Sequence, residues 1–85
     1  MGFTIPEAAR RDMQQQATAA GMPYGTLVGQ KVYDLQGLVD VLADELKAAQ
    51  QSGDTQQIGA VTGKLTRRRA ELAAYQAEQR AAGRS

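Results

Sequence analysis

Apolar residues recur at alternating steps of three and four along two successive stretches of the chain. An alternation of this kind is the seam of a coiled coil, in which every apolar position faces a partner helix. The pattern therefore predicts two long α-helices, over about residues 26–51 and 55–82. The first seam is Val28, Val32, Leu35, Val39, Leu42, Leu46 and Ala49, and the second is Ile58, Val61, Leu65, Arg68, Leu72, Tyr75, Gln79 and Ala82.

The residues between the two seams indicate a reversal of the chain. Gly53 suits the left-handed conformation that commonly follows a helix C-terminus. Asp54 stands three residues before Gln57, the order of a capping box, in which a side chain accepts a hydrogen bond from a free N–H group of the helix that follows. We therefore expect the two helices to fold back on each other as a long antiparallel hairpin.

The register of that hairpin can be tested, because opposing layers of an antiparallel pair have residue numbers with a constant sum. Leu42 then faces Leu65, Leu35 faces Leu72 and Val39 faces Arg68, and each pair sums to 107. The flanking positions predict two pairs of opposite charge, Glu45 with Lys64 and Lys31 with Glu78. Arg68 is expected to extend out of the seam toward Asp40 or Glu71.

A short N-terminal helix is predicted over about residues 5–20. Thr4 and Glu7 have capping-box spacing, Pro6 suits a first turn, and Gly21 suits the end. The turn-rich residues 21–25 follow, with Thr26 as the cap of the next helix. The apolar stripe of this N-terminal helix is thin, so alone it would be marginally stable in water.

One flank of the predicted hairpin is apolar and the other is polar. This asymmetry is what a third helix needs, so we expect either the N-terminal helix or a partner to cover the apolar flank. The fold class is therefore all-α with three helices in one small domain, 1–85, made of an N-terminal part, 1–25, and a hairpin, 26–85. The apolar flank consists of Leu27, Leu38, Val41, Ala48, Ala60 and Ala74.

Composition argues against catalysis. The chain has no cysteine and no histidine, which removes thiolate nucleophiles, zinc–sulfur sites and the commonest metal ligand and general base. We expect no enzyme activity, no cofactor, no metal site and no small-molecule substrate. No apolar run approaches the roughly 20 residues of a membrane span. The expected location is the cytoplasm, or a particle assembled there, without membrane association.

Three features suggest binding to a protein. Glycines inside helices cost about 1 kcal/mol each relative to alanine, and two of them begin a ridge of small residues on the back of the last helix. This ridge is either a tolerated solvent-exposed face or a surface for close helix packing. Tyr33 lies outside the seam, and aromatic residues often anchor interfaces. With Leu38 and Val41 on the apolar flank, the candidate partner-binding residues are Tyr33, Leu38, Val41, Gly59, Gly63, Thr66, Ala70 and Ala73.

These features favour a non-enzymatic structural or adaptor subunit, one that forms a homo-oligomer or docks into a larger assembly such as a phage particle. The alternative is a small nucleic-acid-binding hairpin. Residues 55–85 hold six basic and two acidic residues, whereas residues 1–54 hold four basic and seven acidic ones. Attraction between the two long helices is enough to account for most of this asymmetry. In the alternative, phosphates would be bound by Lys64, Arg67, Arg69 and Arg80.

Overall fold

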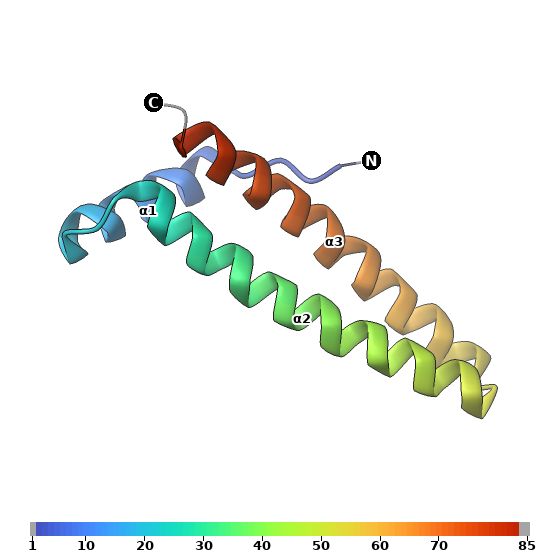
Figure 1. Cartoon of the computed structure of the whole chain (residues 1–85). Helices are drawn as coiled ribbons and strands as arrows, with labels where there is room; N and C mark the ends of the chain where they lie inside the picture. Colours follow the sequence, from blue (N-terminus) through green and yellow to red (C-terminus); the bar gives the residue numbers. More distant parts are fainter. Residues whose placement is uncertain (1, 84–85) are drawn as a thin grey trace.

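The protein is an antiparallel pair of long helices with a short third helix at its open end. The computed structural model describes residues 2–83, which form three helices: α1 (Glu7–Ala20), α2 (Tyr24–Ser52) and α3 (Thr55–Gly83). Figure 1 shows α2 and α3 side by side along their whole length, and α1 beside the end of the hairpin opposite the turn. The structure confirms the all-α hairpin with a short N-terminal helix.

The turn between α2 and α3 forms as its residues predict. Gly53 has φ 74°, the left-handed conformation, and its N–H donates to the Ala49 carbonyl at 3.0 Å. The Asp54 carboxylate accepts a hydrogen bond of 3.1 Å from the Gln57 N–H at the start of α3. Both helix ends therefore satisfy backbone groups that would otherwise have no partner within their helix.

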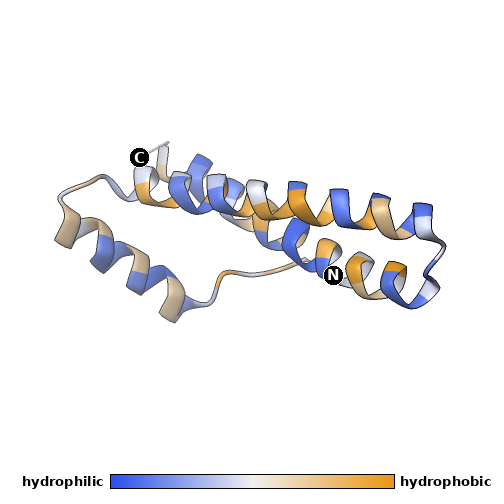
Figure 2. Cartoon of the chain, turned by 90° about the horizontal axis from the view of Figure 1, so that it is seen from below, coloured by the Kyte–Doolittle hydropathy of each residue, from blue (hydrophilic) through white to orange (hydrophobic). Residues whose placement is uncertain are grey.

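The seam between α2 and α3 is the core of the hairpin. Its buried members are Val28, Val39, Leu42 and Ala49 from α2 and Val61, Leu65 and Leu72 from α3, and further seam residues of α2 pack against the central four, Val39, Leu42, Leu65 and Leu72. Apolar residues recur between polar ones along both helices (Figure 2). Arg68, the charged seam position, is exposed, and its guanidinium donates to Glu71 at 2.9 Å. Of the two partners expected for Arg68, the structure therefore selects Glu71.

The start of α1 differs from the prediction. The helix begins at Glu7, two residues late, and Pro6 is its N-cap with ψ 145° and no side-chain cap, so the Thr4 cap was wrong. The preceding segment is extended because its apolar residues reach the hairpin. Ile5 is buried, and the ring of Phe3 stacks on that of Tyr75 with centroids 6.3 Å apart. Burial of Ile5 and stacking of the half-exposed Phe3 ring replace the first helical turn.

The start of α2 also differs, because Pro23 and not Thr26 is its N-cap. α1 ends as predicted at Gly21, which has φ 68°. Residues 21–23 alone therefore connect α1 to α2, and so short a connection folds α1 back onto the hairpin.

α1 covers only the open-end half of the apolar flank. Met13 and Ala17 of α1 form a buried cluster with Leu27 of α2, and Ala74 of α3 packs against this cluster. Nearer the turn, Leu38, Val41, Ala48 and Ala60 remain exposed. The flank that we expected to be covered by α1 or by a partner is thus divided into a covered half and an open half.

Glycines inside the helices fall into two groups. A Cβ atom on Gly29 would lie 2.7 Å from the side-chain nitrogen of Gln79, so this glycine accommodates a close approach of α3. Gly37, Gly59 and Gly63 have open space where a Cβ atom would stand. Gly59 and Gly63 each lower the stability of α3 by about 1 kcal/mol relative to alanine. Packing within residues 2–83 does not compensate for this loss.

We expect Gly59→Ala and Gly63→Ala each to raise the free energy of unfolding by about 1 kcal/mol, because alanine is the better helix former and nothing within the chain blocks its methyl group. Gly29→Ala should raise the free energy of unfolding by less, because the Gln79 side chain must move to make room for the methyl group. Urea denaturation followed by circular dichroism measures all three. A loss of stability at Gly59 or Gly63 would show that the space beside them is filled in solution.

Candidate partner-binding surface

The exposed part of the apolar flank is a shallow groove between α2 and α3. Leu38 is 39% exposed and lies at the centre of the groove, while Val41, one helical turn further along α2, is 54% exposed. Leu42 lines the groove from the hairpin core. We call this surface the flank groove. On α2 it comprises Lys31, Asp34, Leu35, Leu38, Leu42 and Glu45, with the exposed Val41 beside them, and on α3 it comprises Lys64, Arg67, Arg68, Glu71 and Tyr75.

The two edges of the flank groove differ in charge. The α2 edge has Asp34 and Glu45 with one cation, Lys31, and the α3 edge has the cations Lys64 and Arg67. Within residues 2–83 none of these five forms an ion pair, so the predicted ion pair of Glu45 with Lys64 does not form, although both line the groove. An exposed pair of this kind gains little from closing, typically under about 1 kcal/mol. The hairpin therefore leaves both edges available to another molecule.

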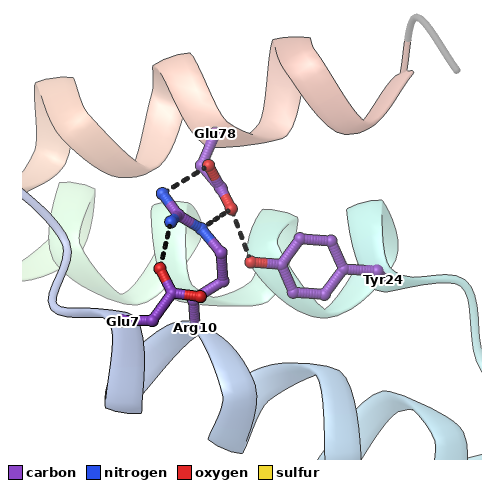
Figure 3. A network of polar contacts seen from close by, with 4 residues as sticks. All are labelled: Glu7, Arg10, Tyr24 and Glu78. Carbon is purple, nitrogen blue, oxygen red and sulfur yellow. Dashed lines mark hydrogen bonds and ion pairs between the residues drawn. The ribbon is translucent and has the colours of Figure 1, made fainter.

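The predicted pair of Lys31 with Glu78 was also wrong, because Glu78 has other partners. The Arg10 guanidinium of α1 donates to the Glu78 carboxylate of α3 at 2.7 and 3.3 Å, and the Tyr24 hydroxyl of α2 donates to it at 2.7 Å. Arg10 also donates to Glu7 at 3.2 Å. Figure 3 shows these four side chains converging from all three helices. The network fastens α1 to the hairpin.

Electrostatics keep this network in one protonation state near neutral pH. The hydrogen bond from Arg10, then that from Tyr24, lowers the pKa of the Glu78 carboxyl below its usual value. Burial, then the hydrogen bond to Glu78, raises the pKa of the Tyr24 hydroxyl to about 12. The carboxylate thus stays charged and the hydroxyl stays protonated. The network holds helices together, and its hydrogen-bonding groups are occupied by one another.

The remaining candidate residues do not join the flank groove. Tyr33 is 81% exposed on α2, beside Gly29 and Gln79 in a second hollow that meets the flank groove at Asp34. On the back of α3, Gly59, Gly63, Thr66 and Ala73 are exposed and Ala70 is partly buried. Gly2 and Phe3 line one hollow together with Thr66 and Ala70. The middle of the ridge of small residues therefore borders the chain's own N-terminal segment.

The four candidate nucleic-acid-binding residues are not on one surface. Lys64 and Arg67 line the flank groove, whereas helical periodicity places Arg69 on the opposite, polar flank of the hairpin. Arg80 lies 13 residues beyond Arg67, about 20 Å along α3 at 1.5 Å per residue. A phosphate in the flank groove would therefore meet Lys64 and Arg67 together but not Arg69. The nucleic-acid hypothesis stays a prediction with weaker geometric support than the protein-binding one.

Other classes of site receive no support from the described residues. Residues 2–83 contain no group of three or more acidic side chains placed to hold a metal ion. Among the three helices described, none has both the length and the apolar character that crossing a membrane requires. Comparison of the chain with protein-family models, curated proteins and solved structures finds no match.

Proposed function

We propose that the protein is a non-enzymatic structural or adaptor subunit that associates through its helical hairpin, with itself or within a larger assembly. A particle assembled in the cytoplasm, such as a phage virion, is one assembly of this kind. The observation that carries the proposal is the exposure of Leu38 and Val41 in the flank groove.

Three properties of the flank groove support this function. Its apolar centre stands between charged edges, the arrangement of a protein interface with an apolar core and a polar rim. It lies on two helices joined by a buried core, so a partner meets a surface that is already ordered. It is also the part of the apolar flank that α1 leaves open, although α1 covers the neighbouring part.

Replacement of both exposed apolar residues by lysine, in Leu38→Lys with Val41→Lys, tests the proposal. We expect the wild type to sediment above its 9.1 kDa mass alone, or to co-purify with a partner from its native cells. The double variant should lose this association and keep its helical circular dichroism, because both positions are exposed. Sedimentation velocity and mass spectrometry of the purified material provide the measurement.

A matched control places two lysines on the polar flank instead, in Gln50→Lys with Thr62→Lys, both at exposed positions. This control adds the same charge and should associate as the wild type does. A wild type that stays monomeric and co-purifies with nothing would refute the proposed function.

A further inference from the structure

The buried residues of the chain form two separate clusters, and α1 belongs to one of them. The cluster in the middle of the hairpin, which contains Leu42 and Leu65, is made by α2 and α3 alone. The other cluster, at the open end, joins Met13 and Ala17 of α1 to Leu27 of α2. Parts of a protein with separate cores commonly open independently. Departure of α1 therefore leaves the middle of the hairpin packed.

The N-terminal segment, residues 2–6, extends the cover that α1 provides. Ile5 is buried in the open-end cluster, and the ring of Phe3 stacks on that of Tyr75. Tyr75 packs against the same cluster and also lines the flank groove. Phe3 thus stands where the covered half of the apolar flank meets the open half. The position of α1 and of residues 2–6 therefore sets the length of the exposed apolar surface.

We propose that α1 and residues 2–6 form a lid, which opens while the hairpin stays folded and thereby lengthens the flank groove to the open end. Opening exposes Leu27 and Ala74, which pack in the cluster under α1 on the same flank as Leu38. The shut lid hides one end of the surface that the proposed function uses. This role of the lid in association rests on the proposed function, whereas its opening does not.

The lengthened surface reaches from Leu27 to Val41, about 21 Å along α2 at 1.5 Å per residue. It is apolar at both ends and carries Lys31, Asp34 and Glu71 between them. A partner that lies along its whole length takes the place of α1. Docking of α1 and binding of such a partner therefore exclude each other, so that each weakens the other by the same factor.

Arg10 is the polar anchor of the lid. Its guanidinium donates to the Glu78 carboxylate at 2.7 and 3.3 Å, and the Tyr24 hydroxyl donates to the same carboxylate from the hairpin (Figure 3). Once detached, a helix of 14 residues is too short to be stable in water, so α1 unfolds as it leaves. Loss of Arg10 should therefore favour the open lid without disturbing the hairpin cluster.

Thiol labelling tests the lid, because the chain has no cysteine and one introduced cysteine is a unique reporter. Ala17→Cys reports opening of the lid and Val39→Cys reports opening of the hairpin, since both positions are buried. Ala48→Cys, at an exposed position, gives the rate of a free thiol. With dithionitrobenzoate as the probe, we expect Ala17→Cys to react more slowly than Ala48→Cys but at least about tenfold faster than Val39→Cys.

Replacement of the anchor, Arg10→Ala, should make the Ala17→Cys protein react about tenfold faster, because hydrogen bonds to a charged group are lost. The rate of the Val39→Cys protein should not change. Arg11→Ala is the matched control, since it removes the same charge from the next residue of α1, which is exposed, and it should change neither rate. Without a cysteine, Arg10→Ala should associate more strongly than the wild type in sedimentation velocity, and Arg11→Ala as the wild type does.

The outcomes separate this inference from the proposed function. Equal rates for Ala17→Cys and Val39→Cys overturn the lid, because α1 and the hairpin then open together. Amide exchange of the unsubstituted chain makes the same comparison if the thiol at position 17 itself loosens α1. Faster labelling in Arg10→Ala without stronger association overturns the role of the lid and leaves the proposed function standing. A chain that associates with nothing, with or without Arg10, refutes the proposed function and that role, while the labelling rates still decide whether the lid opens.

Discussion

Replacing Leu65 with alanine is expected to lower the free energy of unfolding by about 3 kcal/mol. Leu65 is 3% exposed and lies in the cluster formed with Val39, Leu42 and Leu72. Removing a buried leucine side chain costs roughly 2 to 5 kcal/mol, because apolar contacts are lost and a cavity remains. An 85-residue domain has a total stability of roughly 4 to 13 kcal/mol, so the loss is a large fraction of it.

Leu38→Ala is the control for this experiment, since it removes the same atoms from an exposed site. We expect it to change stability by less than about 1 kcal/mol and to weaken association if the flank groove binds a partner. Urea denaturation should show a lower midpoint for Leu65→Ala at an unchanged slope. Equal losses at Leu65 and Leu38 would contradict the assignment of Leu65 to the core and of Leu38 to the surface.

The hairpin could be predicted because its determinants are close in sequence. Alternating steps of three and four identified Leu42 and Leu65 as core residues, and both are buried. Gly53 and Asp54 act through backbone conformation and a hydrogen bond across three residues, so they can be identified without knowledge of the rest of the fold. A charged seam position did not disturb the pattern, because the long side chain of Arg68 leaves the seam for Glu71.

The start of α1 could not be predicted from local signals. Thr4 and Glu7 have capping-box spacing, but Ile5 and Phe3 gain more by reaching the hairpin. The ring that Phe3 stacks on, that of Tyr75, is 72 residues away in the chain. Apolar burial contributes roughly 1.5 to 3 kcal/mol for a large side chain, which exceeds the roughly 1 kcal/mol of a helix cap.

The partners of Glu78 also could not be predicted from local signals, because they come from distant parts of the chain. Helical register placed Lys31 near Glu78, yet an exposed pair contributes too little to fix its own geometry. The Arg10 guanidinium binds Glu78 because the burial of Met13 and Ala17 carries α1 to that place. The only sequence signal was weak: Glu78 follows Ala74 by one turn on the flank that we expected either α1 or a partner to cover.

The candidate surface was predicted in part. The apolar flank was identified from its spacing, and Leu38 and Val41 are exposed on it. How far α1 extends over that flank depends on the turn at Gly21 and Pro23 and on the extended segment before Glu7. The sequence pattern predicted neither the start of α1 at Glu7 nor the start of α2 at Tyr24. The charged edges were first interpreted as attraction between α2 and α3. Their lack of ion pairs within the hairpin is what makes them candidates for contact with a second molecule.

Replacing Glu78 with alanine is expected to loosen α1 while α2 and α3 stay folded. Arg10 and Tyr24 then lose the acceptor that joins them, and a hydrogen bond to a charged group contributes roughly 1.5 to 3 kcal/mol. We expect the lower end of that range, because the network is partly open to water. The backbone amides of α1 should exchange with solvent about tenfold faster, since its 14 residues are too few for a stable isolated helix.

Glu71→Ala is the matched control, one heptad earlier on α3. Glu71 is paired with Arg68, so its loss should leave the exchange of α1 amides unchanged. Hydrogen exchange read residue by residue separates α1 from the hairpin in both variants. Faster exchange throughout α2 and α3 in Glu78→Ala would show that the network stabilises the whole fold and not the docking of α1 alone.

The docking of α1 should also depend on pH through Glu78. The pKa of this carboxyl is lower in the folded protein than its ordinary value of about 4.5, so the contribution of Glu78 to docking is fully present above about pH 4.5 and is lost as the pH falls through the folded-state pKa. The Tyr24 pKa of about 12 keeps that hydroxyl protonated throughout this range. Protection factors of α1 amides should therefore fall on acidification in the wild type and change much less in Glu78→Gln, which has no charge to lose. An equal fall in both proteins would assign the acid sensitivity to a group other than Glu78.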